Sequence, residues 1–316
     1  MDPARRASLA VQRCRTRRAP DERVAVYDLR VESGPLSLTG VVSSDRFRRH
    51  ALAAARAAVD EPVSADVTVL DAIGSPVTTA ERILPVRSDP DADAERVTEL
   101  RYGASATAYD AAGGWRRIRV PDGYFGWVDD RGLRDPVPFD ADGFVTTDDL
   151  TVDGVSLPRA TECEVLGDGR LRFRTGAEVA VDSEVVEAGG AVQSPTGESI
   201  VAQARQYLGT PYRWGGVSEA GIDCSGLVWV AYFRNGVVLP RDADQQRSIG
   251  DPVERDHLEP GDLLFFPGHV AISTGGRSFV HASGSADAVT ENSLDPTAAD
   301  YVADLDDAFE CARRIL

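Results

Sequence analysis

The sequence of 316 residues contains no lysine, so all 34 of its basic residues are arginine. Its four cysteines are too few and too scattered for a disulfide scaffold or for the ligand spacing of a zinc site. They are Cys14, Cys163, Cys224 and Cys311. No apolar run approaches the ~20 residues that a membrane-spanning helix needs. These absences exclude a disulfide-rich domain, a zinc-finger type of domain and a helical membrane protein.

Positive charge is also scarce: 51 acidic residues give a formal net charge of −17. A chain this acidic repels phosphate, so we expect neither a nucleic-acid nor a membrane partner. An acidic surface without lysine is typical of proteins that stay soluble in concentrated salt. The alternative is a GC-rich genome, whose codons favour Arg over Lys. We therefore expect a halophilic source, and the charge says little about the chemistry.

The N-terminal part of the chain divides into a tail and a small module. Residues 1–20 are rich in Arg and Ala and lack the apolar stretch of a secretory signal, which predicts a disordered basic tail and a cytoplasmic protein, with secretion as the alternative. Residues 21–80 read strand–strand–helix–strand, with the helix beginning after Ser43 and Ser44. This order resembles the BON-type α/β module. A generic α/β appendage fits the pattern equally well.

Short strands separated by turn signals fill the middle of the chain, which predicts small β-barrels. Residues 81–136 resemble a bacterial SH3 (SH3b) domain, and the stretch Gly123-Tyr124-Phe125-Gly126-Trp127 is the most specific part of the resemblance. The strand and turn pattern of residues 137–195 predicts a second, diverged SH3-like barrel. The last residues of this segment, from Gly189 to Pro195, are typical of a linker.

Residues 196–316 contain the candidate chemistry. Apolar spacing after Cys224 predicts a helix with Asp223 as its cap, so the thiol would lie where helix N-terminal N–H groups stabilise a thiolate. His269 and His281 lie 12 residues apart on strand-like segments joined by a turn, so a hairpin can set the two imidazoles side by side. One histidine can then activate the thiol while the other orients the first. The alternative is a small core cysteine and two satisfied core histidines.

Six motifs between Leu208 and Ala282 resemble the NlpC/P60 family of papain-like cysteine peptidases. They are Gly209-Thr210-Pro211-Tyr212-Arg213-Trp214-Gly215-Gly216, Asp223-Cys224-Ser225-Gly226-Leu227, Leu239-Pro240-Arg241-Asp242-Ala243-Asp244-Gln245-Gln246, Pro260-Gly261-Asp262-Leu263-Leu264-Phe265-Phe266, Gly268-His269-Val270-Ala271-Ile272 and Val280-His281-Ala282. The resemblance implies an α+β, papain-like catalytic domain over residues 196–316 of a multidomain protein. With an SH3b domain before it, the resemblance points to γ-D-glutamyl-L-diamino acid endopeptidases.

The same resemblance implies catalytic roles at matching positions. Cys224 would be the nucleophile and His269 the general base. His281 would orient His269, and Tyr212 would help the Cys224 backbone N–H to stabilise the oxyanion.

For substrate binding, Asp223 and Ser225 would hold the free amino end of L-Ala-γ-D-Glu. The first barrel would contribute Tyr124, with Tyr102 as the second choice. Trp214 and Arg241 complete the expected substrate-binding set.

These expectations describe a monomeric cysteine peptidase that trims murein-derived peptides with a free N-terminal L-Ala during cell-wall peptide recycling, without a metal or cofactor. If the source has no murein, another γ-glutamyl compound would be the substrate. Two further alternatives remain open. One is acyl transfer or cleavage of another amide by the same residues, and the other is a cell-wall or protein-binding module with a vestigial catalytic domain.

Overall fold

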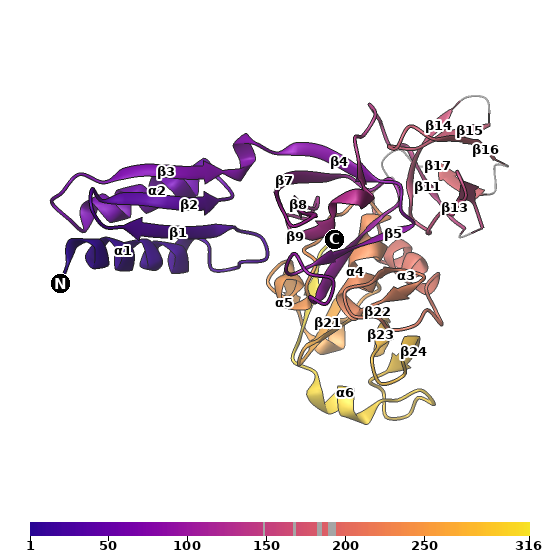
Figure 1. The fold of residues 1–316 in the computed structure, drawn as a ribbon. Helices are drawn as coiled ribbons and strands as arrows, with labels where there is room; N and C mark the ends of the chain where they lie inside the picture. The colour runs from indigo at the N-terminus through magenta and orange to yellow at the C-terminus, as the bar shows by residue number, and fades with distance from the viewer. Residues whose placement is uncertain (148, 167–168, 182–184, 189–193) are drawn as a thin grey trace.

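The computed structural model describes residues 1–316 except 148, 167–168, 182–184 and 189–193, so most of the expected linker lies outside the described residues. Four units follow one another along the chain (Figure 1): an N-terminal α/β module, a β-domain, a second β unit and a C-terminal α+β domain. Separate clusters of buried apolar side chains form inside the units, so each has its own core.

The N-terminal module is a three-stranded sheet covered by two helices. Strand β1 pairs antiparallel with β2, and β2 pairs parallel with β3. The elements are α1 (Pro3–Arg18), β1 (Tyr27–Glu32), β2 (Ser37–Val42), α2 (Asp45–Ala57) and β3 (Ser64–Val69). The strands and α2 agree with the order expected from the sequence, and Ser44 is the N-cap residue of α2.

The expectation of a disordered tail over residues 1–20 is wrong, because helix α1 occupies most of this segment. Ala7 and Val11 are buried in one cluster with Ala51 and Ala55 of α2. Small side chains four positions apart lie on one face of a helix, and this stripe packs on α2 while the arginines stay at the surface. The Arg content suggested solvent exposure, whereas the stripe of small side chains determines the structure.

The first β-domain is a seven-stranded sheet with the strand order β10-β4-β7-β8-β9-β5-β6. Its strands are β4 (Ser75–Thr79), β5 (Ile83–Arg87), β6 (Arg96–Arg101), β7 (Ala106–Ala112), β8 (Trp115–Arg119), β9 (Phe125–Asp129) and β10 (Leu133–Arg134). Gly126 of β9 is required by close packing, since a Cβ there would lie 2.4 Å from Val86 Cγ1. Tyr124, just before β9, is 5% exposed and belongs to the core cluster of this domain.

The second β unit contains a five-stranded sheet, in the order β16-β15-β14-β11-β17, and the hairpin β12-β13. Its strands are β11 (Gly143–Val145), β12 (Thr151–Val152), β13 (Val155–Ser156), β14 (Glu162–Leu166), β15 (Arg170–Arg172), β16 (Glu178–Ala180) and β17 (Val186–Ala188). Leu157, Leu171 and Phe173 are at its core. Its description as a second SH3-like barrel stays a prediction.

The C-terminal domain is built on a sheet in the order β20-β25-β21-β22-β23-β24, in which the strand latest in sequence lies between β20 and β21. Its helices are α3 (Gly197–Arg205), α4 (Cys224–Phe233), α5 (Ala243–Gln246) and α6 (Ala303–Ala308). Its strands are β18 (Val217–Ser218), β19 (Gly221–Ile222), β20 (Asp251–Val253), β21 (Leu263–Phe266), β22 (His269–Gly275), β23 (Ser278–Ser283), β24 (Ala288–Ser293) and β25 (Cys311–Arg314).

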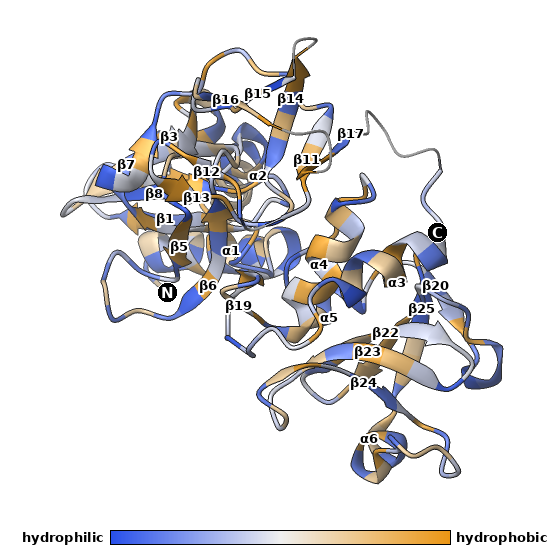
Figure 2. Cartoon of the chain, turned by 90° about the vertical axis from the view of Figure 1, so that its right-hand side faces the viewer, coloured by the Kyte–Doolittle hydropathy of each residue, from blue (hydrophilic) through white to orange (hydrophobic). Residues whose placement is uncertain are grey.

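Strand alternation gives this sheet two apolar faces. In β21, Leu263 and Phe265 pack under α3 and α4, whereas Leu264 and Phe266 face the cluster that includes Leu305 of α6. Figure 2 shows α3 and α4 lying together over β22 and β23, with orange segments where these elements meet. The packing therefore fixes the N-terminus of α4 against β22 and β23.

Buried polar contacts join the first β-domain to the C-terminal domain. Glu99 of β6 is 6% exposed and accepts hydrogen bonds from the Val217 N–H (3.1 Å) and the Ser218 hydroxyl (3.3 Å). Thr98 accepts one from Arg241 Nε at 3.1 Å. Within the part of the chain that the structure describes, no helix has the length and apolarity needed to cross a membrane.

Candidate active site

Cys224 is the first residue of α4, and the residues around it determine where this helix begins. Asp223 is the N-cap, and its Oδ1 accepts a hydrogen bond from the Gly226 N–H at 2.6 Å. Gly226 allows the helix to approach a neighbouring loop, since a Cβ there would lie 2.2 Å from the Gly216 carbonyl oxygen. The positive end of the helix dipole and the Ser225 N–H therefore face the thiol, as the sequence predicted.

The Asp223 carboxylate is saturated by hydrogen bonds. Besides the Gly226 N–H it accepts from the Gly215 N–H at 2.7 Å, from the Ser225 hydroxyl at 3.1 Å, and from Arg241 at 3.0 and 2.7 Å. A carboxylate offers about four lone-pair positions, and five donors already approach this one. Asp223 therefore anchors the start of α4, and its expected contact with a substrate ammonium has no free lone pair in this structure.

Arg241 lies behind the site and not on its surface. Its side chain is 1% exposed and forms a bidentate pair with Asp223, while Nη1 also donates to Ser225 at 2.9 Å. A guanidinium buried this deeply is stabilised by a paired carboxylate and is out of reach of a ligand in solvent. The structure thus differs from the expectation that Arg241 binds substrate directly: it supports the residues that flank Cys224.

The two histidines lie next to each other on β22 and β23, as the expected hairpin requires. His269 Nε2 is 2.8 Å from His281 Nδ1. On its other side His281 Nε2 is 3.0 Å from Asn292 Oδ1 of β24, and Asn292 Nδ2 donates to the Asp300 carbonyl at 3.1 Å. A hydrogen-bond relay of four residues thus runs from His269 to a backbone carbonyl.

This relay fixes the position of each ring proton. A carbonyl only accepts, so the Asn292 amide nitrogen faces Asp300 and its oxygen faces His281. His281 must then carry its proton on Nε2 and present a bare Nδ1, to which His269 Nε2–H donates. The remaining nitrogen of His269, Nδ1, is left with a free lone pair. That is the tautomer a general base requires.

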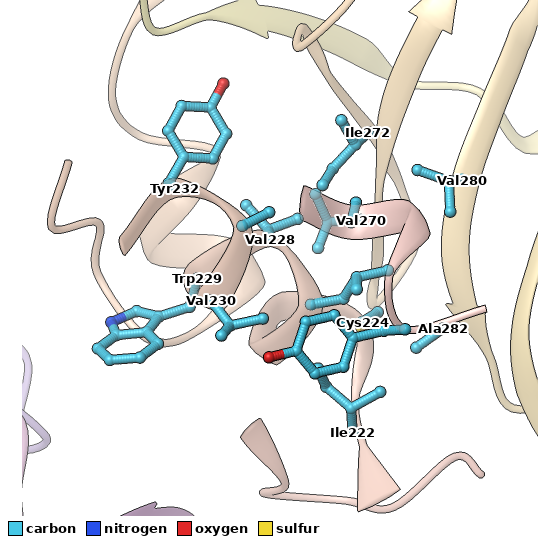
Figure 3. Packing of buried hydrophobic residues seen from close by; sticks show 14 of the residues in the cluster. Ile222, Cys224, Val228, Trp229, Val230, Tyr232, Val270, Ile272, Val280 and Ala282 are labelled. Atoms are coloured by element: carbon cyan, nitrogen blue, oxygen red, sulfur yellow. The ribbon is translucent and has the colours of Figure 1, made fainter. Parts of the chain in front are cut away.

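The thiol lies at the start of β22, the strand that carries this base. The Cys224 sulfur accepts a hydrogen bond from the backbone N–H of Val270, the residue that follows His269. Figure 3 shows Cys224 at the end of its helix, close to Ile222, Val270 and Ala282. Cys224 is 6% exposed, so little of its side chain is accessible to solvent.

Burial keeps both groups neutral. It raises the pKa of Cys224 to about 11, with the Asp223 charge acting in the same direction and the Val270 and Ser225 N–H groups opposing it. Burial and the neighbouring His281 lower the pKa of His269 to about 4. The resting site therefore contains a neutral thiol and a neutral imidazole, which differs from the resting thiolate expected from the helix terminus alone. Desolvation outweighs the helix dipole here.

Comparisons with known proteins agree with this geometry. Residues 209–303, which include Cys224, His269 and His281, match the NlpC/P60 family. The C-terminal domain belongs to the NlpC/P60 family of cysteine peptidases. Residues 86–133 match the bacterial dipeptidyl-peptidase SH3 domain, so the NlpC/P60 domain follows a bacterial SH3 domain in this chain.

Curated relatives share part of the chain. A dipeptidyl-peptidase 6 of Lysinibacillus sphaericus is 51% identical over 102 residues, which are 31% of this chain and 36% of that protein. The gamma-D-glutamyl-L-lysine dipeptidyl-peptidase of Bacillus subtilis is 39% identical over 98 residues, which are 28% of this chain and 33% of that protein. The matches thus span about a third of the length of each relative.

One solved structure covers more of the fold. An NlpC/P60 family protein from Bacillus cereus superposes with a TM-score of 0.64 and 20% identity, over 76% of this chain and 99% of the other. This likeness extends well beyond the NlpC/P60 domain and shows that the two proteins share a fold.

A groove of about 670 Å³ opens over Cys224 of the NlpC/P60 domain. It is lined by Cys224, Asp223, Ser225 and Trp214 from this domain and by Tyr124 from the SH3 domain. Tyr124 thus lies at the position that the sequence assigned to a barrel tyrosine. The second choice, Tyr102, packs edge-to-face on Phe173 at 5.7 Å, in the core of the second β unit, and does not line the groove.

Trp214 forms part of the groove rim. It is 60% exposed, and its Nε1–H donates to Glu95 Oε1 of the SH3 domain at 2.6 Å. Ser225 is 6% exposed and is engaged by Asp223 and Arg241. Of the residues expected to bind substrate, Trp214 is thus exposed at the groove, whereas Ser225 and Tyr124 line it but are mostly buried, with Tyr124 5% exposed.

Tyr212 is half-buried close to the thiol. Burial, together with the negative charge of Asp223, raises the pKa of Tyr212 to about 12, so its hydroxyl stays protonated at neutral pH. A protonated hydroxyl near the nucleophile can donate to a developing oxyanion. Among the described residues, no group of three or more His, Cys, Asp or Glu side chains is arranged to hold a metal ion.

Sequence reasoning missed two parts of this site. One is Asn292, whose signal is weak because a single Asn in a strand is common and its partner His281 is 11 residues away. The other is the segment 21–25, which was assigned to a module without a known role, yet contributes Glu22 and Arg23 to the groove lining. Neither feature has a local motif, because both depend on how distant elements pack.

Proposed function

We propose that this protein is a cysteine peptidase that hydrolyses the γ-D-glutamyl–L-diamino acid bond of cell-wall peptides with a free N-terminal L-Ala. The observation that carries the proposal is a His269–His281–Asn292 relay that begins next to Val270, whose backbone N–H bonds to the Cys224 sulfur, together with a groove lined by Cys224 and Tyr124. The name of the Bacillus subtilis relative, a gamma-D-glutamyl-L-lysine dipeptidyl-peptidase, supports this choice of bond.

The first half of the reaction transfers the acyl group to sulfur. The Cys224 proton moves to the bare Nδ1 of His269 as the sulfur attacks the γ-carbonyl carbon, and the carbonyl electron pair becomes an oxyanion. The Cys224 N–H and the Tyr212 hydroxyl donate to this oxygen. The C–N bond then breaks as His269 gives its proton to the departing amine of the diamino acid. The neutral resting pair supplies the thiol proton and the free lone pair that this step needs.

The second half hydrolyses the thioester. Water enters where the amine left, gives a proton to His269 Nδ1 and adds to the carbonyl carbon. The C–S bond breaks, the dipeptide acid leaves, and the sulfur recovers its proton from His269. His281 and Asn292 do not gain or lose a proton in either half, because they hold the imidazole of His269 in one tautomer and one orientation.

Peptide cleavage tests the proposal directly. L-Ala-γ-D-Glu-L-Lys and its diaminopimelate counterpart are incubated with the protein, and release of L-Ala-γ-D-Glu is followed by mass spectrometry. We expect release by the wild type and none by Cys224→Ala. Cys14→Ala, which removes a thiol of the N-terminal module, is the matched control and should keep full activity. Absence of cleavage by the wild type on both peptides, at any pH from 5 to 9, would refute the proposed function.

A further inference from the structure

A second cavity, of about 230 Å³, lies where three units of the protein meet. We call it the junction cavity. The SH3 domain lines it with β6 and the β8–β9 loop, the second β unit with residues 160–162, and the NlpC/P60 domain with Trp229, Phe233 and Val238. Its lining shares no residue with that of the groove over Cys224, so the two are separate sites.

Arg101 of β6 lines the junction cavity with a buried guanidinium. The residue is 4% exposed, and its Nη1 has no hydrogen-bond partner among the described residues. The guanidinium carbon lies 5.5 Å from the ring centroid of Trp229 and 5.0 Å from that of Phe233. These rings stabilise the positive charge but leave the Nη1 donors unpaired. A buried donor of a charged group without an acceptor costs free energy, so the site favours a ligand that supplies one.

The acidic residues of the lining do not supply this acceptor, because each is bonded to another group. The pairs are Glu99 with Arg96 at 2.6 Å, Glu162 with Arg174 at 3.3 Å, and Asp122 with the Tyr124 backbone N–H at 2.9 Å. The charges of Glu99 and Glu162 act on Arg101 without a hydrogen bond to it, and burial lowers the pKa of Arg101. Arginine keeps its charge even so, and its guanidinium lacks a bonded counter-ion.

Trp229 contributes a second donor and an apolar wall. Its indole Nε1–H is buried and has no partner within hydrogen-bond distance in the described part of the chain. The indole stacks on Phe233, with 4.8 Å between the ring centroids and 10° between the planes. Figure 3 shows Trp229 on the opposite side of its helix from Val270 and Ile272, away from the sheet. A cation, a neutral donor and an aromatic wall together suit a carboxylate that is attached to an apolar body.

The junction cavity has the size and the opening that such a ligand needs. In other proteins a cavity of about 150 Å³ is enough for benzene, and this one is larger. Val238 lines the cavity and is 50% exposed, so the cavity opens to solvent at this residue.

We propose that the junction cavity binds a small organic carboxylate, with its oxygens on Arg101 Nη1 and Trp229 Nε1 and its apolar body against the aromatic rings. The ligand contacts α4, whose first residue is Cys224, and the strand whose Thr98 accepts a hydrogen bond from Arg241. Occupancy therefore stabilises the packing behind the active site. The inference goes beyond the proposed function and does not depend on which peptide is cleaved.

Calorimetric titration of the full-length protein with benzoate tests the proposal, and uncharged benzyl alcohol is the matched ligand. We expect the wild type to bind benzoate with a Kd of about 1 mM or tighter, and benzyl alcohol about tenfold more weakly. Arg101→Met removes the charge and should weaken benzoate binding about 10- to 100-fold, with benzyl alcohol little affected. Trp229→Phe removes the neutral donor and should weaken benzoate binding about fivefold.

Two calorimetric results would overturn the inference: no saturable binding of benzoate by the wild type, or equal affinities of the wild type and Arg101→Met. Arg117→Met is the control variant. Arg117 also lies over an aromatic ring of the SH3 domain, 4.7 Å from the centroid of Trp127, but does not line the junction cavity. This variant should bind benzoate like the wild type. Thermal melting by circular dichroism checks that each variant folds, and Arg101→Gln replaces Arg101→Met if the latter does not fold.

The position of the bound ligand separates this site from the active site. In crystals grown with 4-bromobenzoate, we expect the anomalous signal of bromine in the junction cavity, beside Arg101 and Trp229. A signal only over Cys224, or only at the protein surface, would refute the site. Cys224→Ala should bind benzoate as the wild type does, so a protein that cleaves no peptide can still confirm the carboxylate site, and an active peptidase can still refute it.

Discussion

Replacing Asn292 by Asp should reverse the tautomer of the catalytic histidine and move the activity to higher pH. In the wild type, the Asn292 oxygen accepts from His281 Nε2 at 3.0 Å, and His281 stays neutral because burial lowers its pKa. A carboxylate at the same place favours the imidazolium form of His281. The imidazolium carries a proton on Nδ1 as well and points it at His269 Nε2. His269 must then hold its own proton on Nδ1, where it can no longer accept one from Cys224.

The size of the effect follows from the change in one hydrogen bond. A charge-assisted bond contributes about 1.5–3 kcal/mol against about 1 kcal/mol for the neutral one. The difference corresponds to a rise of about 1 pKa unit in His281. The acid limb of the activity profile of Asn292→Asp should therefore lie about one pH unit higher than that of the wild type. The variant should regain activity at higher pH. Asn292→Ala lacks the acceptor and should lose about fivefold in kcat at all pH values.

Profiles of kcat against pH for the three proteins, measured on L-Ala-γ-D-Glu-L-Lys, provide the assay. Nitrogen-15 NMR of the imidazole rings gives an independent readout, because protonated and bare ring nitrogens have distinct shifts. An Asn292→Asp profile that superposes on that of the wild type would refute the conclusion that the relay sets the tautomer of His269. So would full activity of Asn292→Ala.

Three further predictions concern other parts of the site. Arg241→Met leaves the Asp223 carboxylate buried without its partner and should lower the free energy of unfolding by about 3–5 kcal/mol, measured by urea denaturation; a loss below about 1 kcal/mol would contradict the pairing. Tyr212→Phe should lower kcat about 100-fold with little change in KM, whereas a purely structural role would shift the melting temperature instead. Burial lowers the pKa of His269 to about 4 from 6.5 and also lowers that of His281, so the unfolded chain takes up protons first on acidification. Stability present above pH ~6.5 should be lost between pH ~6.5 and ~4, by on the order of 3 kcal/mol for His269, and a His269→Gln variant should show a flatter dependence.

Local signals were sufficient for the catalytic core. Asp223 followed by a helical apolar pattern predicts the cap and the start of α4, and the turn between two strands predicts the pairing of His269 with His281. These features are set by residues close together in sequence, so the pattern and the structure agree. The order of strands and helix in residues 21–80 can also be predicted from the sequence, because strand alternation and helical spacing are local properties.

Long-range packing determines what the sequence did not reveal. Helix α1 is ordered because Ala7 and Val11 meet α2, and no property of residues 1–20 alone shows this partner. The pKa of Cys224 depends on burial by surrounding elements, which outweighs the helix terminus that the sequence displays. Arg23 and Asp242 are 219 residues apart, and only the assembled fold places them in contact.

The position of β25 has a consequence for synthesis of the protein on the ribosome. This strand pairs with both β20 and β21, so the central sheet of the NlpC/P60 domain has a gap until residues Cys311–Arg314 have left the ribosome. Before that moment β21, which pairs with β22 of the hairpin that carries the two histidines, exposes an unpaired edge on its other side. A nascent chain can therefore complete its N-terminal units early, while the sheet of the NlpC/P60 domain is complete only when the latest strand is inserted.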